Sequence, residues 1–134
     1  ERERLKKFVD AGGLLIIDSA GGDGEVNTAA ESELRAIFGN AAAGLDQPLP
    51  ESHALYNTPS KIELGYRTFA RGKIVGSMTS PRVRGIERNG RLAVVYSPED
   101  LSVGLVGQPV DGIIGYTPAT ATELMKRLLV NRLP

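Results

Sequence analysis

The chain has 134 residues with 16 basic and 16 acidic side chains, one histidine and no cysteine, and 41% of the residues are hydrophobic. This length and composition predict one compact domain over residues 1–134. The absence of cysteine excludes disulfides, thiolate metal sites and a cysteine nucleophile from this chain, and zero net charge argues against a nucleic-acid binder. Apolar runs reach about five residues, where a membrane span needs roughly 20, so we predict no membrane contact by this segment.

The first predicted elements are a helix and a buried strand. Leu5, Phe8 and Val9 recur at helical spacing, and the glycine pair at 12–13 is expected to end the helix. The unbroken apolar run at 14–17 is typical of a strand covered on both faces. A helix followed by such a strand is the second half of a β-α-β unit. We therefore expect this chain to be the C-terminal part of a larger domain or protein, lacking its first strands.

A second helix and an irregular stretch follow. Thr28 and Glu31 have the spacing of a capping box, which predicts a helix over residues 28–38. Several prolines predict irregular backbone over residues 40–60, because proline blocks continuous helix.

The clearest turn signal lies within residues 83–96. Asn89 and Gly90 separate two strand-like runs there, and both residue types tolerate the positive φ that a type I′ β-hairpin requires. The second run, residues 92–96, has the composition of a buried strand. A further short strand is predicted at 74–75.

The C-terminal part is predicted to be a loop and a helix. Residues 97–115 are rich in glycine and are expected to form the loop. The helix is expected from Pro118, capped either by Thr117 or by Thr120 together with Glu123.

Charge is balanced only in total. Residues 10–64 hold nine acidic and two basic side chains, whereas residues 67–91 hold seven basic side chains against Glu87 alone. Three outcomes stay open: scattered solvation, pairing within the domain, or two opposite patches for a partner or a second protomer, which keeps an oligomer possible. With 5% aromatic residues the chain offers few stacking surfaces, so we predict no nucleic-acid partner.

Polar side chains follow both predicted buried strands, the one at 14–17 and the one at 92–96. If these strands are parallel, their carboxyl ends share one edge of the sheet, where open α/β sheets place ligands. We predict a crevice there that takes a small polar ligand or a protein segment. The alternative, that the two aspartates only stabilise turns, stays open. The candidate ligand-binding residues are Asp18, Ser19, Ser97, Asp100 and Ser102.

The sequence contains only weak signals for a catalytic site or a metal site. His53 is the one possible base, and a set with Asp18 or a serine is formally possible, but no serine lies in a G-x-S-x-G elbow. A structural hydrogen bond is the competing role for His53. Asp18, Asp23 and Glu25 lack the order of a calcium loop. We therefore assign no catalytic residue and predict no metal and no cofactor.

Several segments, taken in order, carry a family resemblance: residues 3–13 leading into 14–18, then 53–56, 90–102 and 130–131. Together they resemble a bacterial family of domains of unknown function described as class I glutamine-amidotransferase-like. Proteins that carry this domain are often secreted or membrane-anchored. The resemblance covers nearly the whole chain.

The resemblance implies a flavodoxin-like three-layer α/β sandwich whose opening strands precede the first helix of this chain. It also implies an extracytoplasmic or membrane-anchored protein, held through an upstream segment. Working amidotransferases use a cysteine, which this chain lacks, so glutaminase chemistry would need an upstream nucleophile. We therefore predict a non-catalytic binding or interaction domain, with a hydrolase-like enzyme acting on a sugar or an amide as the alternative.

Overall fold

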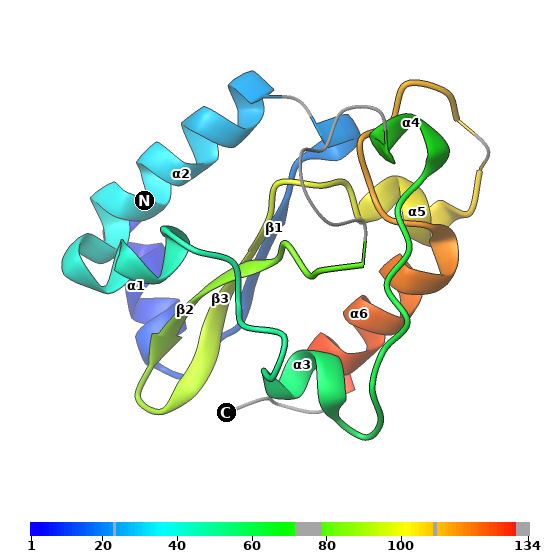
Figure 1. The fold of residues 1–134 in the computed structure, drawn as a ribbon. Helices are drawn as coiled ribbons and strands as arrows, with labels where there is room; N and C mark the ends of the chain where they lie inside the picture. Colours follow the sequence, from blue (N-terminus) through cyan, green and yellow to red (C-terminus); the bar gives the residue numbers. More distant parts are fainter. Residues whose placement is uncertain (23, 72–78, 109, 131–134) are drawn as a thin grey trace.

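The fold was analysed in a computed structural model, which describes residues 1–22, 24–71, 79–108 and 110–130 (Figure 1). These residues form six α-helices, two 3-10 helices (η) and three strands. In chain order the elements are α1 (Arg2–Asp10), β1 (Leu15–Asp18), η1 (Ala20–Gly22), α2 (Gly24–Phe38), η2 (Gly39–Leu45), α3 (Ala54–Asn57), α4 (Thr68–Arg71), β2 (Arg84–Arg88), β3 (Arg91–Ser97), α5 (Ser102–Val106) and α6 (Pro118–Val130). The mixed α/β class expected from the sequence is confirmed.

The three strands form one small open sheet in the order β1-β3-β2. β1 pairs in parallel with β3, with Leu15 opposite Val94 and Asp18 opposite Ser97. This is the arrangement on which the predicted crevice depended. β2 pairs with β3 in antiparallel fashion. β3 is therefore the central strand, and β1 lies at an edge of the sheet.

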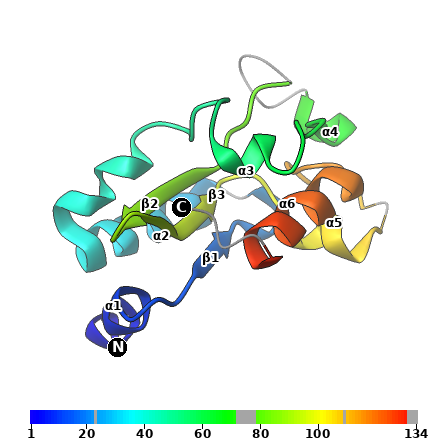
Figure 2. The ribbon, with the colours of Figure 1, turned by 90° about the horizontal axis from the view of Figure 1, so that it is seen from below.

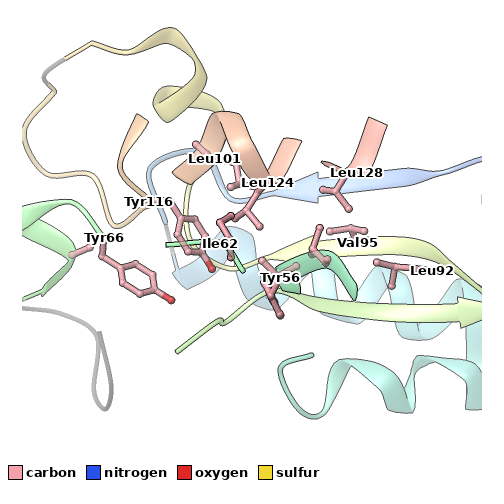
Figure 3. Packing of buried hydrophobic residues seen from close by; sticks show 13 residues of the cluster. Tyr56, Ile62, Tyr66, Leu92, Val95, Leu101, Tyr116, Leu124 and Leu128 are labelled. Atoms are coloured by element: carbon pink, nitrogen blue, oxygen red, sulfur yellow. The ribbon is translucent and has the colours of Figure 1, made fainter. Parts of the chain in front are cut away.

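One face of the sheet packs against α3 and α6 (Figure 3). Leu55 of α3 and Leu124 and Leu128 of α6 share a buried cluster with Val95 of β3. Burying such aliphatic side chains stabilises the fold by roughly 2 kcal/mol each.

The opposite face packs against α1, α2 and η2. Val9 of α1, Leu34 and Phe38 of α2 and Leu45 of η2 share a second buried cluster with Tyr96 of β3. Helices thus cover both faces of the sheet, and Figure 2 shows the helices on the two sides of the strands. Among the described helices, none is long and apolar enough to cross a bilayer.

The turn chemistry expected from the sequence is confirmed at two places. Asn89 (φ 53°) and Gly90 (φ 74°) both have positive φ, as a type I′ hairpin requires. α1 ends at the predicted glycine pair, where the Gly12 and Gly13 amides donate to the carbonyls of Val9 and Phe8.

The predicted start of the second helix is wrong. α2 begins at Gly24, and the Thr28 hydroxyl donates to the Gly24 carbonyl at 3.0 Å, one turn back inside the helix. A threonine used in this way cannot act as the N-cap, so no capping box with Glu31 forms.

Two stretches contain helices that the sequence did not predict, and the structure selects one of the two caps predicted for the last helix. The stretch 40–60, expected to be irregular, contains most of η2 and all of α3, and the loop at 97–115 contains α5. α6 begins at Pro118, and the Thr117 hydroxyl accepts the Thr120 amide at 3.4 Å, which selects Thr117 as the cap. The strand predicted at 74–75 lies outside the described residues.

Candidate functional site

The carboxyl ends of β1 and β3 lie side by side and bring two polar loops together. Asp18 pairs with Ser97 in the sheet register, and the Ser19 amide donates to the Ser97 carbonyl at 3.1 Å. Asp100 and Ser102 follow within the loop that leaves β3 and begins α5. The five residues proposed from the sequence therefore meet at one edge of the sheet.

Each of the two aspartates bonds to the loop that follows the other strand. Oδ2 of Asp18 accepts the amides of Leu101 and Ser102, each at 3.0 Å. Oδ2 of Asp100 accepts the Gly21 amide at 2.6 Å, and Asp100 is fully buried. Hydrogen bonds to a charged acceptor are stronger than those between neutral groups. Because each aspartate bonds to the opposite loop, these bonds hold the two loops against each other.

A local bond completes the arrangement, because Oδ1 of Asp100 also accepts the Val103 amide at 2.9 Å. We call Asp18, Asp100 and the four amides that they accept the carboxylate clasp. A carboxylate that already accepts two amides has fewer lone pairs left for a ligand. The clasp geometry therefore matches the turn-stabilising role that the sequence left open for these aspartates.

The serines differ in how accessible they are. Ser19 and Ser97 are buried, and the Ser97 hydroxyl donates to the Glu99 carbonyl at 2.6 Å. Ser102 is half-buried, and no partner for its hydroxyl is found among the described residues. Of the three candidate serines, Ser102 is the one whose side chain can reach a ligand without first breaking a bond inside the fold.

His53 lies apart from this edge and caps α3. Its Nδ1 accepts the Leu55 amide at 3.1 Å, and its ring meets the Tyr56 ring edge-on at 6.4 Å. In a Ser-His-acid set the Nδ1 carries a hydrogen that it donates to the acid, so an accepting Nδ1 does not fit. Burial lowers the pKa of His53 below its usual value. The geometry matches the structural role that competed with catalysis.

Sequence reasoning missed a buried acid at the same end of the sheet. Glu99 is 4% exposed, and Oε1 accepts the Arg82 guanidinium at 2.7 Å. Burial raises the pKa of Glu99 above its usual range, although the ion pair with Arg82 opposes the shift. Oε2 has no hydrogen-bond partner among the described residues. In the sequence, Glu99 is marked only by its position shortly after the apolar run at 92–96.

Three tyrosines from distant parts of the chain lie near this acid. The rings of Tyr66 and Tyr116 stack with their centroids 4.8 Å apart (Figure 3). Burial raises the pKa of Tyr66 to about 12 and also raises that of Tyr56 and Tyr116. No local pattern predicts this cluster, because Tyr56 lies in α3 and the other two tyrosines lie in separate segments far from it in the sequence.

The described residues offer no metal centre. No group of three or more histidine, aspartate or glutamate side chains within them lies close enough to hold an ion. Asp23, one of the three acids considered as calcium ligands, lies outside the described residues.

The acidic and basic segments pair within the domain, at least in part. Arg88 of β2 donates to Asp10 of α1 at 2.9 Å, and Arg84 lies 3.6 Å from Glu31 of α2. Lys6 and Arg88 both hold the pKa of the Asp10 carboxyl below its usual range, with Lys6 contributing more. Of the three outcomes left open by the sequence, internal pairing thus has direct support.

Comparison with curated proteins and with solved structures gives no match for this chain. A family model described as "Domain of unknown function (DUF4159)" matches residues 1–131. The match spans every described helix and strand, including the two loops that meet at the carboxylate clasp. The chain therefore belongs to this family of domains of unknown function.

Proposed function

We propose that this domain is a non-catalytic binding domain whose ligand lies at the carboxyl edge of β1 and β3. The ligand is a small polar molecule or a polar protein segment. The observation that carries the proposal is the clasp, which links the two loops that leave neighbouring parallel strands. Ligands of open α/β sheets lie outside this edge, and loops held rigid by internal bonds make a preformed site.

We propose no catalytic role because the side chains that could act as acids or bases already form hydrogen bonds within the fold. Both oxygens of Asp100 and Oδ2 of Asp18 accept backbone amides, and Nδ1 of His53 accepts another. Each of these groups therefore already has a structural role in holding a loop or the start of a helix. The hydrolase alternative gains no support from this geometry.

We also propose a fold family and a location for this domain. Helices on both faces of a sheet with parallel β1 and β3 support a flavodoxin-like, amidotransferase-like sandwich. We place the domain in a bacterial cell-envelope protein on the resemblance of its segments alone. Fold similarity does not carry activity with it, so the amidotransferase-like layout and the missing cysteine are compatible.

Thermal unfolding in the presence of a panel of amino acids, amides and sugars tests the binding proposal. A ligand present at about 100 times its Kd should raise Tm by about 5 °C or more. Ser102→Arg fills the edge while both aspartates are retained, and it should abolish that rise. Ser52→Arg, at an exposed serine in the loop before α3, is the matched control and should keep it. A rise that survives Ser102→Arg, or a panel without any rise, would contradict the proposal.

A further inference from the structure

A cavity of about 430 Å³ lies between α3 and two irregular segments, residues 61–64 and 79–81. The apolar part of its wall is formed by Tyr56, Ile62, Leu64 and Pro81. Tyr56 and Ile62 belong to the buried cluster shown in Figure 3. Small-molecule sites in proteins are clefts of roughly 300–1,000 Å³ with largely apolar walls. The cavity therefore has the size and the kind of wall that a small ligand requires.

Hydrogen bonds to buried parts of the fold hold both walls of the cavity in place. The Ile62 amide donates to the Tyr56 carbonyl at 2.7 Å, which ties the first segment to α3. The Tyr66 hydroxyl donates to the Ser80 carbonyl at 3.0 Å, which ties the second segment to a buried tyrosine. A site whose walls are already ordered loses less conformational entropy when a ligand binds. The two hydrogen bonds thus support a preformed site.

The charged side chains that line the cavity carry more negative than positive charge. Among the described lining residues these are Glu51 and Glu63 against Lys61, and all three are exposed. The Ser80 hydroxyl donates to Oε1 of Glu51 at 3.0 Å and so holds this carboxylate at the rim. Within the described part of the chain, neither carboxylate forms an ion pair. The opening of the cavity therefore presents two carboxylates to a cation.

Two neighbouring cations leave this negative charge in excess. Arg82 directly follows the wall residue Pro81, but its Nε donates to Oε1 of Glu99 at 2.7 Å, so its charge is already balanced. Lys61 offsets one of the two carboxylates at most, and its flexible stem lets the ammonium group stay in solvent. A positively charged ligand is attracted by the remaining carboxylate charge, whereas an anion is repelled.

Tyr56 adds a hydrogen-bonding group beside the apolar wall. This residue is 3% exposed, and its hydroxyl has no hydrogen-bond partner among the described residues. Leaving a buried hydroxyl unpaired costs free energy, so buried polar groups in proteins nearly always have a partner. A ligand that brings an N–H group to this wall supplies one, because a phenol oxygen accepts hydrogen bonds.

We propose that this cavity binds an organic amine as a protonated cation. The ammonium group of the ligand pairs with the carboxylates of Glu51 and Glu63. Its aromatic or aliphatic body packs against Tyr56, Ile62 and Leu64. The proposal is independent of the ligand site at the carboxyl edge, because none of the residues that line the cavity belongs to the carboxylate clasp.

A two-dimensional NMR titration of the chain with phenethylamine at neutral pH tests the proposal. The largest amide shifts are expected at residues 51–64 and 79–81, which surround the cavity. Phenylpropionate carries a carboxylate where phenethylamine carries its amine, and the two molecules share the same ring and the same two-carbon linker. It is therefore the matched ligand control, and it should not shift these amides.

Charge variants at the opening of the cavity should change the affinity for phenethylamine in opposite directions. Glu51→Gln combined with Glu63→Gln should weaken binding about fivefold or more, because two exposed charge pairs are lost. Lys61→Gln should tighten binding, because it removes a charge of the same sign as the ligand. Glu3→Gln, at an exposed carboxyl of α1, is the matched control and should leave the affinity unchanged.

Three results would overturn the proposal. One is binding of phenylpropionate as tightly as phenethylamine, since Lys61 would then select the ligand. Another is amine shifts confined to residues 18–22 and 100–103, since the amine would then bind at the carboxyl edge. The third is a titration in which neither molecule shifts any amide around the cavity.

Discussion

At the scale of single residues, the order of the two loops at the carboxyl edge depends on two carboxylates. Asp18 and Asp100 together accept four backbone amides, and three of these bonds join parts of the chain that are about 80 residues apart. The sequence predicted that these residues meet if the two buried strands are parallel, and they are parallel. It could not predict that each aspartate bonds to the opposite loop, since that depends on loop conformations that local residues do not determine.

Removing the Asp18 carboxylate should destabilise the protein. Asp18→Ala leaves the Leu101 and Ser102 amides without their acceptor, and we expect the free energy of unfolding to fall by about 2–3 kcal/mol. Asp18→Asn keeps an acceptor oxygen and should cost less. Urea unfolding measures the difference. As a control, Asp46→Ala removes an exposed partner of Arg35 and should cost less than about 1 kcal/mol. Equal losses for Asp18→Ala and Asp46→Ala would show that the clasp is not structural.

Glu99 should make stability depend on pH. Burial raises the pKa of Glu99 above its usual value of 4.5, so the folded protein holds this proton more tightly than the unfolded chain. The contribution of Glu99 to stability is therefore greatest below pH 4.5 and is lost as the pH rises through the raised pKa.

Glu99→Gln, which cannot ionise, provides the test. The stability advantage of the wild-type protein over this variant should shrink as the pH increases from 4 towards neutral, in urea unfolding at a series of pH values. Glu63→Gln, at an exposed carboxyl, controls for the loss of one charge. An advantage that grows with pH would mean that the ion pair with Arg82 outweighs burial.

At the scale of helices and strands, a short helix can depend on a single contact that is hard to predict from the sequence. α3 has four residues, Ala54–Asn57, and His53 directly before it serves as its N-cap. Histidine is an unusual cap, and sequence rules that expect serine, threonine, aspartate or asparagine miss it. The hairpin at Asn89-Gly90 and the helix starting at Pro118 were predictable, because backbone geometry there depends on the residue types themselves.

The cap of α3 predicts a difference between two substitutions. His53→Ala removes the acceptor of the Leu55 amide and should cost about 1 kcal/mol, whereas His53→Asn keeps an acceptor and should cost less. Burial lowers the pKa of His53, so the fold favours the neutral ring. The stability that this ring contributes is lost as the pH falls below its usual value of 6.5. Chemical unfolding at pH 5 and pH 8 should show a smaller cost of His53→Ala at the lower pH.

The close contact between α5 and α6 predicts that a larger residue at Gly104 destabilises the fold. A Cβ added to Gly104 of α5 would lie 2.5 Å from the Ala121 Cβ of α6, so the two helices would have to separate. We expect Gly104→Ala to lower the free energy of unfolding by about 2 kcal/mol. Gly24→Ala, at the start of α2 where a Cβ would meet nothing within 4 Å, should be neutral or stabilising. Thermal unfolding of both variants gives the comparison, and equal Tm values would contradict close α5-α6 packing.

At the scale of the whole molecule, a neutral chain with unevenly distributed charges folds so that its acidic and basic segments meet. Asp10 pairs with Arg88, and Glu31 lies near Arg84, across elements that are far apart in sequence. The composition predicted the imbalance, but only the β2-β3 hairpin packing against α1 and α2 shows where the charges pair. We expect the sedimentation mass of residues 1–134 to be the same at about 20 mM and 500 mM salt, since such a change would screen a charge-driven dimer. A mass that falls with salt would mean that these segments pair between protomers.

The most direct test of a ligand site at the carboxyl edge of β1 and β3 is a two-dimensional NMR titration with the molecule from the polar panel that raises Tm most. The largest amide shifts should fall at residues 18–22 and 100–103, on both sides of the clasp, and Ser102→Arg should remove them. Shifts confined to other regions, such as the 430 Å³ cavity beside Tyr56 and Lys61, would contradict the placement of the ligand at the carboxyl edge.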